Sequence, residues 1–197
     1  DVYPTALKLA TYVGIFGLVD SMAYLRRAFE RKAEEFSDVL KMGRTQLQDA
    51  VPMTLGQEFQ TYAIMLGEDE ERLKEAALLI REINLGATAI GTGICADLRF
   101  RTTATRHLAA ITGLPITAAS DPVAAMTDMS GYIATSQTVK NLAIHLKKAA
   151  DDLRLLNSGP HTGFDDLNVP ARQAGSSIMP GKVNPVIPEC VNQCCFM

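Results

Sequence analysis

Apolar residues recur at alternating intervals of three and four along the first part of the chain. The pattern extends from Pro4 to about Glu35 and is carried by Ile15, Leu18, Met22, Leu25 and Phe29. An interval that averages 3.5 residues places these side chains on one face of a helix. Pro4 suits the first turn, because its missing N–H has no intrahelical partner there. We therefore predict a long helix over residues 4–35 with one buried seam.

A second helical pattern begins at Thr54, and Gln57 three residues later completes a capping box. The apolar residues at helical spacing predict a buried stripe made of Leu55, Phe59, Tyr62, Leu66, Leu73, Ala77 and Ile80. The acidic run at residues 68–71 is interpreted as a solvated face. We expect this helix to end near residues 84–86, where a glycine-containing connection follows.

A third pattern predicts the longest helix of the chain. Asp121 caps it, Pro122 occupies its first turn, and a near-perfect heptad follows at Val139, Leu142, Leu146, Ala149, Leu153 and Leu156. A helix from Pro122 to Asn157 would be about 50 Å long at 1.5 Å per residue. A shorter helix is expected around residues 101–112.

No stretch of the chain alternates apolar and polar residues between hairpin turns, so we predict no sheet. The helical patterns indicate an all-α fold, an elongated antiparallel bundle of long helices. Seams of this length expose more apolar surface than three helices can bury among themselves, which favours self-association. The two main polar connections, residues 41–53 and 174–186, are predicted to be irregular loops.

The composition argues against several classes of function. Among the 197 residues, 47% are hydrophobic and the formal net charge is -3, which argues against a nucleic-acid or anionic-membrane partner. We find no apolar run that is long and uncharged enough to span a bilayer and no leader-like segment, so we expect a cytoplasmic protein. Because the chain begins at Asp1 and stops at Met197 within a helical pattern, we expect it to be part of a longer protein.

Four cysteines are present, Cys95, Cys190, Cys194 and Cys195, without a C-x-x-C pair or a histidine at ligand spacing. Their spacing is poor for a metal site, and structural disulfides are unusual in a reducing compartment. We interpret them as buried free thiols and propose no metal.

The loop from Gly175 to Pro185 gathers the groups that a small carboxylate needs. Ser176 and Ser177 offer two adjacent hydroxyls, while Lys182 and Asn184 offer a point charge and a directional donor. Gly175 lets the backbone approach a ligand closely. A plain turn can contain the same residue types, so composition alone makes this loop only a candidate site.

Two segments together resemble a known family. The eleven residues 175–185 resemble the signature of the aspartase and fumarase superfamily, and residues 43–50 resemble its second signature region, in the expected order. The match looks closest to the aspartase branch because Gln46 stands where fumarases usually have histidine. Residues 84–93, Gln173-Ala174 and 186–189 also have the aspartase form. Cys95 and His161 stand where the family usually has asparagine and arginine.

The resemblance implies a specific chemistry. Aspartate would lose ammonia to give fumarate through an aci-carboxylate intermediate, without a cofactor, and Ser176 would be the general base. Ser177 would hold the reacting carboxylate. The other carboxylate would be bound by a set that draws on both loops, namely Lys182, Asn184, Thr45 and Gln46.

The resemblance also implies an assembly. Residues 1–197 would be mostly the central helical-bundle domain of a homotetramer, without the amino-terminal and carboxy-terminal domains. Each active site would be shared between three subunits, so that Thr45 and Gln46 meet Ser176 only across a subunit boundary. The fragment alone would then be inactive. Two alternatives stay open, namely a fumarase that interconverts malate and fumarate, and a non-catalytic helical bundle that scaffolds assembly.

Overall fold

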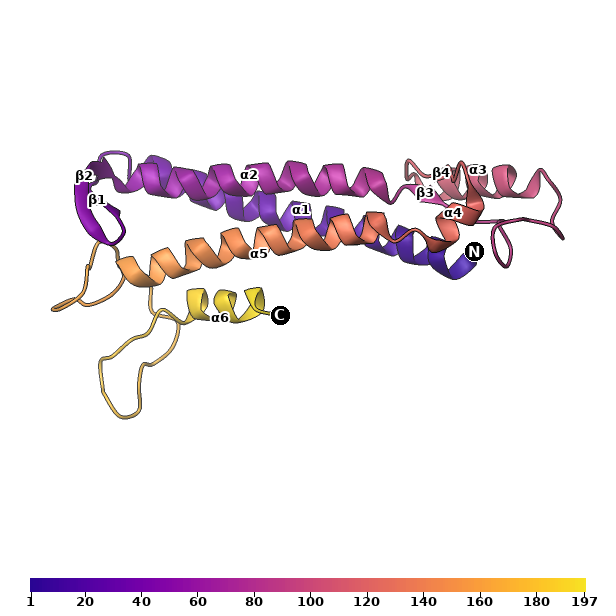
Figure 1. Cartoon of the computed structure of the whole chain (residues 1–197). Coiled ribbons are helices and arrows are strands. Elements are labelled where there is room, and N and C mark those ends of the chain that lie inside the picture. The colour runs from indigo at the N-terminus through magenta and orange to yellow at the C-terminus, as the bar shows by residue number, and fades with distance from the viewer. The chain divides into compact units, whose positions relative to one another are not determined.

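The structure, a computed structural model, describes all residues from 1 to 197 and is dominated by helices (Figure 1). The helices are α1 (Val2–Glu35), α2 (Leu55–Leu79), α3 (Phe100–Thr112), α4 (Pro122–Thr127), α5 (Ser130–Leu156) and α6 (Val186–Cys195). The strands are β1 (Leu40–Thr45), β2 (Gln48–Thr54), β3 (Glu82–Ile83) and β4 (Thr117–Ala118). The predicted all-α class is confirmed, with two small sheets added.

The chain divides into two compact units. Unit 1 contains Asp1–Tyr24 and Glu68–Val139, and unit 2 contains Leu25–Gly67 and Lys140–Met197. Both candidate loops lie in unit 2.

Unit 1 is built around the first part of α1, the end of α2 and a two-stranded parallel sheet of β3 and β4. Its core includes side chains that are at most 4% exposed, among them Ile15, Leu73, Ile80 and Ile83. The Lys8 ammonium donates to the Glu82 carbonyl at 2.7 Å, and burial of this ammonium lowers its pKa. The predicted helix at residues 101–112 is confirmed as α3, and Gly113 closes it in the left-handed conformation.

Unit 2 has a core of aromatic residues from α1, from Phe36 just after it, and from α2. The Phe29 and Tyr62 ring centroids lie 5.4 Å apart, and Phe36 meets Phe59 edge to face at the same distance. Leu55 and Ala33 complete the buried cluster with Ala149 of α5. Aromatic pairs at these separations add about 0.5–1.5 kcal/mol each beyond the area that they bury.

The predicted start and buried face of α2 are confirmed. All seven residues of the predicted stripe are buried. The Gln57 N–H donates to Thr54 Oγ1 at 3.1 Å and the Thr54 N–H donates to Gln57 Oε1 at 3.0 Å, which is the reciprocal capping box. The helix ends at Leu79, earlier than predicted, because the chain then enters β3.

The segment predicted to be an irregular loop after α1 is instead an antiparallel hairpin of β1 and β2. Its pairing runs from Leu40 opposite Thr54 to Thr45 opposite Gln48, with a bulge at Gly43. The prediction was wrong because most residues of both strands are exposed, so no apolar face marks them. At Gly43 a side chain would not fit, since a Cβ atom there would lie 2.8 Å from the Val51 carbonyl oxygen.

The predicted rod from Pro122 to Asn157 is also corrected. It breaks into α4 and α5, which leaves α1, with 34 residues, as the longest helix. The break lies at Asp128, whose carboxylate accepts hydrogen bonds from the Ser130 N–H at 2.9 Å and the Ser130 hydroxyl at 2.5 Å. A carboxylate that satisfies the first N–H groups starts a new helix. The predicted Asp121 cap is confirmed for α4, through the N–H groups of Val123 and Ala124.

Two interpretations of polar and sulfur side chains were wrong. Within the acidic run, Asp69 is fully buried and Glu70 is 5% exposed, and the Arg72 guanidinium donates to Asp69 at 2.8 Å. Helical geometry turns adjacent residues to different faces, so an acidic run need not be solvated throughout. The cysteines are free, but Cys95, Cys190 and Cys194 are exposed and Cys195 is half-buried.

Helix α1 is long and apolar enough, by length and composition, to cross a membrane, contrary to the sequence prediction. Its most apolar window has a mean hydropathy of 1.4, of which 22% is buried within the chain. The reason is that the charges of this helix concentrate after Tyr24, with only Lys8 and Asp20 before it. A core helix of a soluble protein and a signal sequence near an N-terminus pass the same test, so one such helix is weak evidence of a membrane span.

Candidate active site

The turn between β1 and β2 presents Gln46 in a strained conformation. Thr45 pairs with Gln48, so Gln46 and Leu47 form a two-residue hairpin turn with φ angles of 51° and 63°. Positive φ at both central residues is the type I′ geometry, which glycine and asparagine normally occupy. For other residues this backbone region costs about 1–2 kcal/mol each. Strain of this kind persists only where surrounding contacts hold it.

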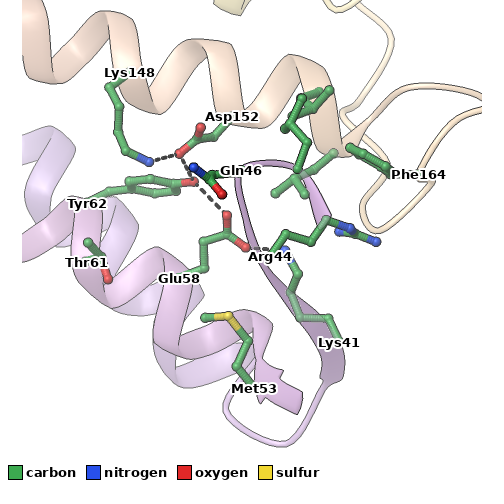
Figure 2. A pocket seen from close by; sticks show the side chains of 13 residues that line it. Lys41, Arg44, Gln46, Met53, Glu58, Thr61, Tyr62, Lys148, Asp152 and Phe164 are labelled. Carbon is green, nitrogen blue, oxygen red and sulfur yellow. Dashed lines mark hydrogen bonds and ion pairs between the residues drawn. The ribbon is translucent and has the colours of Figure 1, made fainter. Parts of the chain in front are cut away.

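Gln46 lines a cavity of about 390 Å³ in unit 2 (Figure 2). Charged groups from three elements also line it, with Lys41 and Arg44 from β1, Glu58 from α2, and Lys148 and Asp152 from α5. Lys41 pairs with Glu58, and Lys148 pairs with Asp152. Two ion pairs, each between a lysine and a carboxylate, therefore line this cavity.

Tyr62 joins the two ion pairs. Its hydroxyl lies 3.2 Å from a Glu58 oxygen and 3.1 Å from an Asp152 oxygen, and the side chain is 1% exposed. A phenol has one hydrogen to donate, so it serves one carboxylate at a time. Burial, and then the nearby charges of Glu58 and Asp152, raises the pKa of Tyr62 far above its ordinary value.

Ser176 lies within a tight turn of the second candidate loop. Its Oγ accepts hydrogen bonds from the N–H groups of Ile178 at 3.2 Å and Met179 at 3.3 Å. The Ser176 N–H donates to the Lys182 carbonyl at 3.1 Å. This hydrogen bond joins the two ends of the segment from Ser176 to Lys182, and we call this point the neck of the loop. Two N–H dipoles directed at one hydroxyl oxygen favour negative charge on that oxygen.

The other predicted residues of this loop surround the turn. Ser177 and Lys182 are exposed, and Asn184, two residues before α6, is half-buried. Gly175 has φ +94°, and a Cβ atom there would lie 2.7 Å from the Lys182 carbonyl oxygen. This glycine therefore permits a close approach of the backbone within the loop itself.

The structure places the two candidate loops in one unit but does not join their side chains. None of Ser176, Ser177, Lys182 and Asn184 lines the cavity that contains Gln46. Thr45 is exposed at the end of β1. No three histidine, cysteine, aspartate or glutamate side chains are grouped so that they could hold a metal ion.

Sequence reasoning missed the charged cluster around Tyr62. A partial signal existed, because Glu58 and Tyr62 are four residues apart in one helix, as are Lys148 and Asp152 in another. The spacing within each helix does not show that these two helical faces meet. Tyr62 was predicted only as a core residue.

The comparisons with known proteins give the class of protein, a lyase of the fumarase and aspartase type. The sequence pattern of the family described as Lyase matches residues 1–197, and the chain belongs to this family. Aspartate ammonia-lyase of Pseudomonas canavaninivorans is 56% identical over 197 residues, which are 100% of this chain and 42% of the relative. The resemblance to the superfamily is thereby confirmed.

Solved structures agree. The cobalt-bound crystal structure of fumarate lyase:delta crystallin from Brucella melitensis has a TM-score of 0.96 and 50% identity, covering 100% of this chain and 43% of that chain. Recombinant class II fumarase from Schistosoma mansoni has a TM-score of 0.96 and 32% identity, covering 100% and 44%. The chain thus spans less than half the length of the proteins that it matches.

Proposed function

We propose that the full-length protein is an aspartate ammonia-lyase that reversibly converts L-aspartate to fumarate and ammonia. The observation that carries this proposal is the Ser176 turn, where two backbone N–H groups point at Oγ in the loop that also holds Lys182 and Asn184. The 56% identity to an aspartate ammonia-lyase supports the choice of substrate.

In the proposed reaction, ionised Ser176 Oγ removes a proton from the carbon next to the side-chain carboxylate. The electron pair left on that carbon spreads onto the carboxylate as an aci-carboxylate, which needs donors aimed at its oxygens. The pair then returns to form the double bond, and ammonia leaves the neighbouring carbon with the electrons of the C–N bond. The N–H groups of Ile178 and Met179 lower the free energy of the alkoxide that starts this sequence.

The remaining residues bind substrate in this proposal. Ser177 holds the reacting carboxylate, and Lys182 and Asn184 bind the other one together with Thr45 and Gln46. When these residues hold the substrate in one orientation, the reaction is faster because the reacting groups are already aligned. No cofactor takes part.

We further propose that the full-length protein is a cytoplasmic homotetramer with active sites shared between subunits. Exposed apolar side chains remain on the long helices, including Val13 and Tyr24 of α1, Ile64 of α2 and Ile144 of α5. The separation of Gln46 and Ser176 into different surroundings fits a site that a second copy completes. Light scattering on the full-length protein tests this, and a stable active monomer would contradict it.

Replacing Ser176 by alanine tests the function. In the full-length protein, Ser176→Ala should reduce fumarate formation from aspartate by about 10²- to 10⁴-fold, since a general base is lost, and leave the oligomer intact. Ser37→Ala, at an exposed serine after α1, is the matched control and should keep full activity. Retained activity in Ser176→Ala would refute the assigned base.

Fumarase activity is the second candidate, favoured by the likeness to the class II fumarase at 32% identity. The two reactions share fumarate, so its ultraviolet absorbance reports both. Supplying aspartate and malate in separate assays distinguishes them. Turnover of malate alone would replace the first proposal by the second.

A further inference from the structure

The strained turn that presents Gln46 requires a support that its own sequence does not supply. Gln46 and Leu47 both have positive φ, and neither is a glycine or an asparagine. The exposed strands on either side add little packing. Contacts from outside the turn must therefore hold this conformation.

Arg44 supplies such contacts from two positions before Gln46. Its Nη1 lies 2.5 Å from Asp166 Oδ2, and its guanidinium carbon lies 4.1 Å from the centre of the Phe164 ring. Its Nε lies 3.4 Å from an oxygen of Asp49, on the opposite strand of the hairpin. The planar guanidinium of Arg44, on β1, thus contacts β2 and the segment that follows α5. A lysine ammonium cannot make this combination of stacking and directed hydrogen bonds.

The Arg44–Asp166 pair is shielded from solvent. The two side chains are 18% and 15% exposed, and the Lys41 ammonium also approaches Asp166, at 3.5 Å. The hydrogen bond to Asp166 raises the pKa of Arg44, so the guanidinium stays charged. A partly buried charge-assisted hydrogen bond with defined geometry positions its partners better than an exposed ion pair does.

The segment that receives Arg44 is itself anchored to the end of α5. The Asp166 N–H donates to the Leu156 carbonyl at 2.9 Å, and the Asp165 N–H donates to the Ser158 carbonyl at 2.9 Å. The Phe164 N–H donates to Ser158 Oγ at 3.1 Å. The ring and the carboxylate therefore present a preformed surface to Arg44.

We propose that Arg44 is a positioning residue for substrate binding, because its contacts with Phe164 and Asp166 hold the turn that presents Gln46. Arg44 acts through Gln46 and does not itself contact substrate. The inference rests on the proposed role of Gln46 in binding a carboxylate of aspartate. Its specific consequence is that substitutions at Arg44 and Gln46 are energetically coupled.

A double-mutant cycle in the full-length protein tests this coupling. Arg44→Lys should raise the KM for aspartate, and the inhibition constant of succinate as an unreactive dicarboxylate, by about tenfold, the effect of one lost well-placed interaction. The kcat should change by less than about threefold, because the contact serves ground-state binding. In a Gln46→Ala background, Arg44→Lys should change KM no further.

Two more variants keep the test decisive. Phe164→Leu removes the stacking surface but keeps the ion pair, and should raise KM in the same direction even if Arg44→Lys folds poorly. Arg72→Lys alters an arginine that pairs with Glu68 and Asp69 in unit 1, and should leave KM unchanged.

Additive effects of Arg44→Lys and Gln46→Ala, or an unchanged KM in both Arg44→Lys and Phe164→Leu, would overturn the inference alone. If the unsubstituted protein turned over no aspartate, the proposed function would fail, and this inference with it.

Discussion

The backbone N–H of Ser176 donates to the carbonyl oxygen of Lys182 at 3.1 Å, so the two ends of the serine loop are tied together at its neck. This bond brings two residues six positions apart into one turn. The ammonium of Lys182 and the hydroxyl of Ser176 therefore belong to a single preformed element.

Gly175 makes this neck possible, because it combines φ +94° with a space too small for a Cβ atom beside the Lys182 carbonyl. Gly175→Ala should open the neck and lower kcat/KM for aspartate by about 10²-fold, as misplacement by an ångström can. The melting temperature should change little, because the loop is mostly exposed. Gly181→Ala is the matched control, with φ +85° but nothing within 4 Å, and should have a much smaller effect. Equal losses in the two variants would contradict this reading of the neck.

The buried phenol of Tyr62 predicts a loss of stability at alkaline pH. Its folded pKa is raised by burial, whereas the ordinary value is 10.0. Above about pH 10 the unfolded chain loses this proton and the folded chain keeps it, so the folded state binds more protons and its stability falls as pH rises. The slope reaches about 1.4 kcal/mol per pH unit for this one group.

Tyr62→Phe removes the titrating group and should abolish that part of the pH dependence. Urea unfolding of both proteins from pH 8 to 11 measures the difference in free energy of unfolding. At neutral pH the variant should be less stable by about 1 kcal/mol, because it loses the hydroxyl contact with Glu58 and Asp152. Tyr24→Phe, at a side chain that is 70% exposed, is the control. Parallel pH profiles for the wild type and Tyr62→Phe would show that the phenol is not responsible.

The capping box at the start of α2 predicts a loss of stability when its side chains are removed. Thr54→Ala removes the acceptor of the Gln57 N–H and should lower the free energy of unfolding by about 1 kcal/mol. Thr61→Ala, in the second turn of the same helix, removes an exposed hydroxyl that donates to the Gln57 carbonyl at 3.1 Å. Thr61→Ala should change the free energy of unfolding by no more than about 0.5 kcal/mol. A urea midpoint that shifts equally in both variants would count against the cap.

Local patterns located most of the helices correctly. Three predicted helix ends are confirmed, and each depends on residues within four positions of one another. They are the Thr54–Gln57 capping box, the Asp121 cap and the helix end at Gly113. The α2 stripe was predicted completely because one periodicity continues along it. The break at Asp128 was missed because the heptad that follows hid a capping carboxylate within the pattern.

The candidate site was less accessible to sequence reasoning. Motif resemblance identified Ser176 and Gln46 as candidates, but not the conformations that they adopt. The positive φ of Gln46 has no signature in its neighbours, since neither glycine nor asparagine stands in the turn. The two N–H donors to Ser176 depend on a turn whose composition is compatible with several conformations.

The sequence by itself determined the helical class, the starts of α2 and α4 and the location of the two candidate loops along the chain, because periodicity and capping act over one or two turns of chain. Only the tertiary structure decided that Arg44 meets Asp166, 122 residues away, and that Tyr62 lies between Glu58 and Asp152. Such pairs form when distant segments meet, and their energy depends on a separation and a burial that the folded chain alone establishes.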